Sequence, residues 1–200
     1  ISAFDEKMET FNCQELTNVL CSFARLGSAK SQAFEMLGDH RYSRWQKYAL
    51  SRIYEFTAED VAMSLWATTS VRKPLTKALK SALIDKFKEH LNVLTHRQFT
   101  IAMNALSGND LEKYSELKSN IEDSFRERIP ELSPRQLSNA LVIISKLSIP
   151  LKSCTISKLK SHLVDQLSQY DPVDLSTLIW ALRCLNLPLP MHFYVEFRTQ

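Results

Sequence analysis

Apolar and polar residues follow the period of an α-helix along most of this chain. Three segments show it most clearly: FTAEDVAMSLWATTSVRKP from Phe56, LSPRQLSNALVIISKLSIP from Leu132 and YDPVDLSTLIWALRCLNLP from Tyr170. Apolar residues recur within them at i, i+4 and i+7, a spacing that places them on one helix face. Few β-branched residues alternate with polar ones over the length of a strand, and the 200 residues include only 3 Gly and 7 Pro. The sequence therefore predicts an all-α fold.

The helical segments form an internal repeat. Starts at Phe56, Leu94, Leu132 and Tyr170 lie 38 residues apart, and a fifth copy starts at Phe11, 45 residues before Phe56. A period of this length is typical of stacked helical hairpins, because one hairpin cannot bury its apolar face alone. We predict that the whole chain is one right-handed α-solenoid. Its repeats span approximately 11–55, 56–93, 94–131, 132–169 and 170–200, the last one truncated.

Each copy begins with the residues of a capping box. In this arrangement an N-cap side chain and an acid or amide three positions later satisfy backbone N–H groups at a helix start. The pairs are Asn12 and Glu15, Thr57 and Asp60, Thr95 and Gln98, Ser133 and Gln136, and Asp171 and Asp174. An apolar set follows at constant register and marks the buried face of the first helix of each hairpin, helix A. The sets are Leu16, Leu20 and Phe23; Val61 and Leu65; Phe99, Met103 and Leu106; Leu137, Leu141 and Ile144; and Leu175, Ile179 and Leu182.

Prolines at one register mark the end of helix A. Pro74, Pro150 and Pro188 are separated by multiples of 38 residues, and Glu112 takes this place in the third copy. Proline cannot continue helix A, and its fixed φ suits a first turn, so we expect it to begin the second helix, helix B. Helix B repeats as well. Its equivalent apolar positions are Leu83, Ile121 and Leu159; Phe87, Phe125 and Leu163; and Leu91, Ile129 and Leu167.

Motif and period together resemble a known family. A capping box, a leucine and a Leu-Trp-Ala type motif on a 38-residue period, as in DLSTLIWALRCLNLP and DVAMSLWATTSVRKP, resemble the octotricopeptide repeat proteins. Their relatives are the heptatricopeptide-repeat proteins and the FAST-kinase-like mitochondrial proteins, many of which end in a RAP domain. The resemblance covers Phe11 to about Pro188, and no RAP-like region is visible. It implies an organellar protein that binds single-stranded RNA along its helices and acts in RNA maturation, stability or translation, or in mitochondrial ribosomes.

Charge and cysteine usage limit the function classes. A net charge of +3 is far below that of a protein that holds nucleic acid by bulk charge, so any RNA contact is expected to be local. The four cysteines stand singly without a C-x-x-C pair, which favours a reducing compartment over a zinc site or a disulfide framework. No metal-binding histidine spacing, glycine-rich phosphate loop or G-x-S-x-G motif occurs. We expect no catalysis, no metal, no cofactor and no membrane span.

If helix A lines a concave surface, the residues beside its buried face at i, i+4, i+7 and i+11 would meet RNA bases. In the first two copies these are Gln14, Asn18, Cys21 and Arg25, then Glu59, Met63, Trp66 and Ser70. From all copies we select as candidate RNA-binding residues Asn18, Arg25, Trp66, Arg97, Asn104, Arg135, Asn139, Lys146, Thr177 and Trp180. A protein that recognises one base with each repeat requires these residues to vary between copies, because amide and hydroxyl side chains form hydrogen bonds with different base edges. An unconstrained surface would vary as well.

Two sets of residues have a competing interpretation. Trp66 and Trp180 share one register and could stack on bases. Their apolar neighbours favour packing between adjacent A helices instead. Lysines of the predicted B helices, such as Lys86 and Lys152, could contact phosphate, but a solvated helix face with acidic partners such as Glu89 is the favoured explanation.

Two function classes remain. The first is an RNA-binding helical-repeat protein of the mitochondrion or another organelle, on its matrix side. It would be a mitochondrial ribosome component or a maturation and stability factor for rRNA or mRNA, and its partners would be single-stranded or ribosomal RNA and protein subunits of a ribonucleoprotein. The second is an α-solenoid scaffold that binds no RNA and holds protein subunits in a large assembly. The repeat signature favours the first class, and the weak net charge favours the second.

Overall fold

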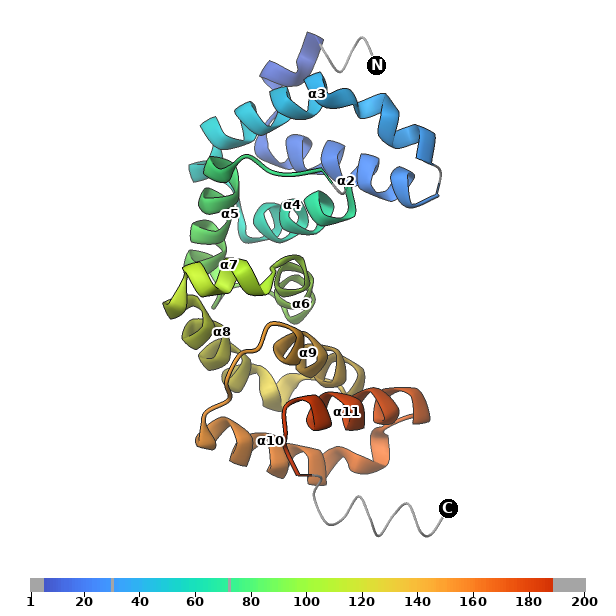
Figure 1. Ribbon diagram of the computed structural model, residues 1–200, viewed down its shortest axis with the longest axis vertical. Coiled ribbons are helices and arrows are strands. Elements are labelled where there is room, and N and C mark those ends of the chain that lie inside the picture. Colours follow the sequence, from blue (N-terminus) through green and yellow to red (C-terminus); the bar gives the residue numbers. More distant parts are fainter. Residues whose placement is uncertain (1–5, 30, 72, 189–200) are drawn as a thin grey trace. The chain divides into compact units, whose positions relative to one another are not determined.

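The computed structural model describes residues 6–29, 31–71 and 73–188, and every regular element within these ranges is helical (Figure 1). The all-α prediction is confirmed. The contacts divide the chain into two compact units, Ile1–Ala105 and Leu106–Gln200, and each is described by itself.

The two units are built from short helices joined by tight connections. The first unit contains η1 (Met8–Thr10), α2 (Cys13–Ala29), α3 (Ser31–Ser51), η2 (Ile53–Glu55), α4 (Ala58–Val71), α5 (Lys77–His90) and α6 (His96–Ala105). The second unit contains α7 (Gly108–Lys113), α8 (Ser115–Arg128), η3 (Ile129–Glu131), α9 (Pro134–Lys146), α10 (Ser153–Gln166), η4 (Leu167–Gln169) and α11 (Pro172–Cys184). None of these described helices is long and apolar enough to cross a membrane.

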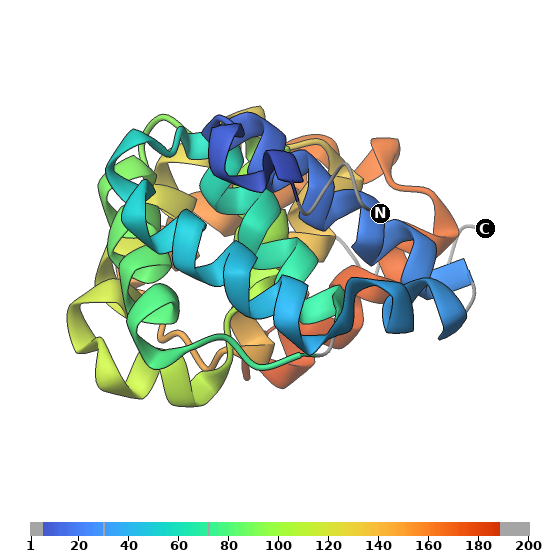
Figure 2. The same cartoon turned by 90° about the horizontal axis from the view of Figure 1, so that it is seen from above.

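Within each unit, A helices pack against A helices and B helices against B helices. In the first unit the A helices α2, α4 and α6 are successive neighbours, while α3 packs on α2 and α5 packs on α4 and α3 (Figure 1 and Figure 2). In the second unit α9 packs on α11, and α8 packs on α10. Within each unit the A helices therefore pack on A helices and the B helices on B helices.

The helix A starts are fixed by the predicted capping boxes. At α2 the Asn12 backbone N–H donates to the Glu15 carboxylate at 2.8 Å, and the Glu15 N–H donates to the Asn12 amide oxygen at 2.9 Å. The same reciprocal bonds form at the starts of α4, α6 and α9. At α11 the Asp171 carboxylate accepts from the Asp174 N–H at 2.7 Å. A further box, Ser107 with Asp110 at the start of α7, was not predicted.

Residues with a left-handed backbone conformation, rather than prolines, end two of the A helices. Ser148 after α9 and Asn186 after α11 have φ of 51° and 54° and occupy the same register, 38 residues apart. The N–H of the following residue bonds to the carbonyl five positions earlier, at 3.1 Å in α9 and 2.9 Å in α11. This is the hydrogen bond of a Schellman motif, which satisfies helix-end carbonyls.

The expected role of proline as the first turn of helix B is wrong. Helix α5 begins at Lys77 and α10 at Ser153, each three residues after Pro74 or Pro150. Proline disfavours helical geometry in the residue before it, so it keeps the connection extended until an N-cap is reached. Glu112 lies inside α7, and the third helix B is split into α7 and α8 at Tyr114.

A side chain from the preceding hairpin caps helix B in both units. On α3, the Gln46 amide oxygen accepts from the Thr76 N–H at the start of α5, at 2.6 Å. Two repeats later, on α8, Glu122 Oε1 accepts from the Lys152 N–H at the start of α10, at 3.1 Å, and from the Thr155 hydroxyl. Both capping side chains are buried, and this bond joins consecutive hairpins.

The core lies between the two layers of each unit. All nine predicted helix B positions are buried, including Phe87 and Phe125 at 0% exposure. Most predicted helix A positions are buried as well, but Phe23, Leu175 and Ile179 are only half-buried. Across the layers, the buried Trp45 indole N–H of α3 donates to a backbone carbonyl of α2 at 2.9 Å. Most of the positions that the period selects are therefore buried in both layers.

Candidate nucleic-acid interface

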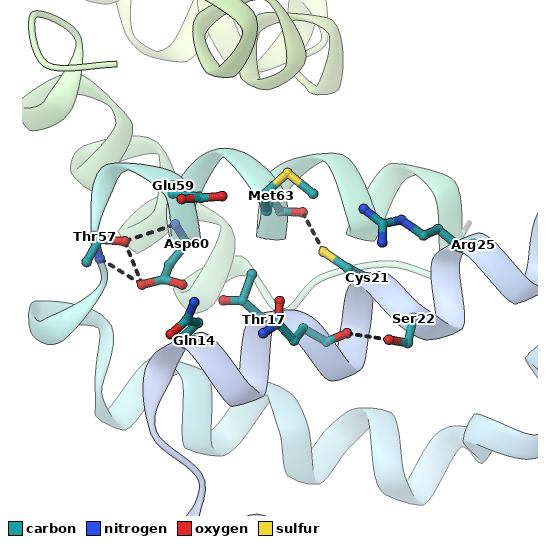
Figure 3. Close-up of a pocket in the computed structure, with 10 residues that line it drawn as sticks. Gln14, Thr17, Cys21, Ser22, Arg25, Thr57, Glu59, Asp60 and Met63 are labelled. Atoms are coloured by element: carbon teal, nitrogen blue, oxygen red, sulfur yellow. Dashed lines mark hydrogen bonds between the residues drawn. The ribbon is translucent and has the colours of Figure 1, made fainter. Parts of the chain in front are cut away.

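A groove of about 540 Å³ runs between α2 and α4, on the side predicted to meet RNA (Figure 3). Its lining residues are Gln14, Thr17, Asn18, Cys21, Ser22 and Arg25 of α2, and Thr57, Glu59, Asp60 and Met63 of α4. Six of the ten occupy the predicted register, including all four such positions of the first copy. The volume lies in the range of small-ligand sites.

Hydrogen bonds between α2 and α4 hold the walls of the groove together. The buried hydroxyls of Thr17 and Ser64 lie 3.3 Å apart, and the Cys21 thiol donates to the Met63 carbonyl at 3.7 Å. Burial raises the pKa of the Cys21 thiol to about 11, so the thiol remains a protonated donor at neutral pH. Asp60 is occupied by the capping box of α4. The groove is therefore preformed.

Polar side chains remain available along its rim. Gln14, Asn18 and Glu59 are exposed, and within the described part of the chain their side chains make no hydrogen bond or ion pair. Arg25 lies toward the other end of the groove, with its guanidinium carbon 6.0 Å from the centre of the Trp66 ring. Gln14 and Glu59 stood in the predicted register but were not selected as candidates, because only their position across one groove distinguishes them.

The candidates of the first unit share one face. Asn18 and Arg25 lie on α2, the half-buried Trp66 on α4, and the exposed Arg97 and Asn104 on α6. Because these three A helices pack as neighbours, their common register places the residues on one side of the layer. Arg25 and Trp66 also meet across two helices, as a cation beside an aromatic ring.

The second unit presents its candidates on α9 and α11. Arg135, Asn139 and Lys146 are exposed on α9, whereas Thr177 is half-buried and donates its hydroxyl to a carbonyl of its own helix at 2.8 Å. Trp180 is 55% exposed. Among the described residues no A helix follows α11, so the two interpretations of Trp180, base stacking and packing between A helices, both stay predictions.

The exposed charged residues of α9 and α11 are mainly cations. Arg135, Lys146 and Arg183 are exposed on α9 and α11. Helix α9 contains no acidic residue, and α11 contains only Asp174, which is half-buried. The exposed Trp180 on α11 offers a stacking platform, and the exposed cations of the two helices offer phosphate-binding charge.

Lys86 and Lys152 form ion pairs with acidic side chains, as the favoured explanation predicts. Lys86 Nζ lies 2.7 Å from Glu89, and Lys152 Nζ lies 2.7 Å from Asp123 and 3.1 Å from Glu122. The hydrogen bond from Lys152 lowers the pKa of Asp123. These lysines belong to salt bridges of the outer layer.

Cys154, at the start of α10, is a feature that sequence spacing did not reveal. The thiol is exposed, and the Arg126 guanidinium donates to it at 3.6 Å. Desolvation raises the pKa of this thiol, but the hydrogen bonds from Arg126 and Thr155 and the charge of Arg126 together lower it below that of an ordinary cysteine. The pair forms between helices α8 and α10, so only the fold brings it together.

A family model described as the Tbc2 translation factor, N-terminal domain, matches residues 1–186. The chain belongs to this Tbc2 family. The predicted membership of the octotricopeptide, heptatricopeptide, FAST-kinase-like or RAP families is therefore wrong. A capping box followed by an apolar face serves the start and the packing of a stacked helix A, so these residues indicate an architecture and not one family. No curated protein matches the chain significantly.

Membership of the Tbc2 family indicates a translation-related function, with association to RNA or the ribosome. This agrees in general terms with the first function class.

Proposed function

We propose that this chain is an RNA-binding module of a translation factor and that its A helices carry the RNA-binding face. The observation that carries the proposal is the surface of the packed pair α9 and α11, on which Trp180 is 55% exposed and the cations Lys146 and Arg183 are exposed as well. Exposure of a large indole has a cost in water that a stacked base would remove. The module acts by positioning RNA and not by catalysis.

The finer features of the proposal follow from the repeat. The 38-residue hairpins are expected to stack into a right-handed α-solenoid, so that the A helices form a continuous RNA-binding surface. We further propose that the protein works in the mitochondrion or another organelle, in a ribosome or on rRNA or mRNA during maturation. The four free thiols support a reducing compartment. Imaging of the full-length protein fused to a fluorescent tag tests the localisation.

Binding of labelled single-stranded RNA, followed by fluorescence anisotropy over a salt series, tests RNA recognition. The triple variant Arg135→Ala/Lys146→Ala/Arg183→Ala is expected to weaken binding and to flatten the salt slope by about 0.7 for each phosphate that is no longer neutralised. A matched variant removes three exposed cations of the B helices, Lys47→Ala/Lys77→Ala/Lys160→Ala, and is expected to retain the slope. Absence of RNA affinity, or an equal effect of both variants, would refute the proposal.

Protein binding is the second candidate function, and the apolar part of the same surface favours it. Val173 is 72% exposed on α11, the helix that also carries Trp180, and large exposed apolar residues are enriched at protein interfaces. Ultraviolet crosslinking of the tagged full-length protein separates the two functions. Recovery of a discrete RNA supports the first, and co-purified proteins without crosslinked RNA support a scaffold.

A further inference from the structure

The charges of the groove between α2 and α4 determine which part of an RNA it can receive. Glu59 and Asp60 line the groove in the first turn of α4, and Arg25 of α2 lies toward the opposite end of the groove (Figure 3). Two carboxylates repel a phosphate, so the RNA backbone is expected to lie outside the groove. A base that points inward meets the acidic end.

We propose that this groove binds a guanine base of single-stranded RNA, and the proposal rests on the RNA-binding function proposed above. An ionised carboxylate only accepts hydrogen bonds. Guanine is the one RNA base whose Watson–Crick edge presents two adjacent donors, N1–H and the N2 amino group. Glu59, exposed and without a partner among the described residues, can accept both at once.

The other bases fit this carboxylate poorly. Uracil flanks its single N–H donor with two carbonyl oxygens, which the carboxylate repels. Cytosine and adenine each place an acceptor ring nitrogen next to their amino donor. The exposed amides of Gln14 and Asn18 line the same groove and can donate to guanine O6. The groove therefore offers acceptors and donors in the combination that guanine requires.

The carboxylate is specific to this pair of helices. At the register of Glu59 the other copies carry Gln14, Arg97, Arg135 and Val173. A residue needed only for packing or capping would recur with the repeat, as the capping boxes do. The bonds of Thr17 with Ser64 and of Cys21 with Met63 also fix the groove before ligand binds, which limits the ordering cost of recognition.

The test uses the full chain and a set of labelled single-stranded RNAs. One RNA contains uridine only, and the others carry a single guanosine, inosine, adenosine or cytidine within the same uridine sequence. We expect guanosine to strengthen binding about 5- to 150-fold over uridine, the range for a bidentate base contact. Inosine, which lacks the 2-amino group, should lose most of this gain.

Glu59→Gln removes the charge and one acceptor, and is expected to abolish most of the guanosine preference while uridine RNA binds as before. Glu127→Gln makes the same change at an exposed position of α8 and should preserve the preference. RNA binding without a guanosine preference, or a preference that survives in Glu59→Gln, overturns the guanine assignment and leaves the proposed function intact. Failure of all RNAs to bind overturns the proposed function and the guanine assignment with it.

Discussion

Glu122 offers a direct test of how consecutive hairpins are held together. Its side chain is 1% exposed, and Oε1 accepts from the backbone N–H of Lys152 and from the hydroxyl of Thr155. Replacement by alanine removes the acceptor of both donors and leaves the Thr155 hydroxyl in a fully buried site and the Lys152 N–H in a partly buried one. We therefore expect Glu122→Ala to destabilise the fold through α10 and not through α8, the helix that carries the mutation.

The magnitude follows from the two orphaned donors. Each buried donor left without its partner costs about 1–3 kcal/mol. The ion pair with Lys152 adds little, because that lysine side chain is 44% exposed and the pair is screened. The two donors together cost about 2–6 kcal/mol, and the lower half of this range, about 3 kcal/mol, applies because the Lys152 N–H is only partly buried. For a chain of this size, about 3 kcal/mol lowers Tm by roughly 6–12 °C. Glu122→Gln keeps the Oε1 acceptor, as Gln46 does in the first unit, and should cost less than about 1 kcal/mol.

Thermal and urea unfolding followed by circular dichroism measure these differences. The matched control is Glu127→Ala, which removes an exposed carboxylate from the same helix. Hydrogen exchange localises the effect, because amides at the start of α10 should lose protection in Glu122→Ala before those of α9. Equal stability of Glu122→Ala and Glu127→Ala would refute the reasoning that the buried cap joins the hairpins.

Three further predictions concern single sites. Ser148→Gly is expected to stabilise the chain by about 0.5–1 kcal/mol, because Ser148 has a φ of 51°, which glycine adopts without strain. Asn186→Gly should stabilise it less, because asparagine tolerates a positive φ better than serine does. Equal gains for the two variants in urea unfolding would contradict this explanation. Arg126→Ala should slow iodoacetamide alkylation of Cys154 at neutral pH, because loss of the hydrogen bond and of the positive charge raises the pKa of the thiol. Alkylation rates measured by mass spectrometry should become equal for variant and parent protein in alkaline buffer, where both thiols are ionised. A rate difference that persists there would indicate altered access to the thiol instead. Trp45→Phe should lower the free energy of unfolding by about 1–3 kcal/mol, because it removes a buried hydrogen bond to α2 and leaves a cavity. An unchanged midpoint of urea unfolding would exclude that bond as a stabilising interaction.

Local patterns in the sequence were sufficient to predict the helices and much of their packing. A capping box satisfies the backbone of its own helix, so pairs such as Ser133 and Gln136 mark a helix start without knowledge of the fold. A helical period likewise selects the buried face, as Phe87 and Phe125 confirm. The same locality explains the wrong family prediction, because residues that start and pack a helix are shared by many stacked-hairpin proteins.

The site and the links between hairpins depended on tertiary structure. The position of Glu59 across a groove from Gln14, the buried cap that Glu122 supplies to α10, and the hydrogen bond of Arg126 with Cys154 all join different helices. A repeat period indicates which residues share a register, but packing decides which of them meet and which remain exposed. Trp66 and Trp180 occupy one register, yet one is half-buried beside Arg25 and the other is exposed, because burial depends on the neighbouring helix and not on the residue itself.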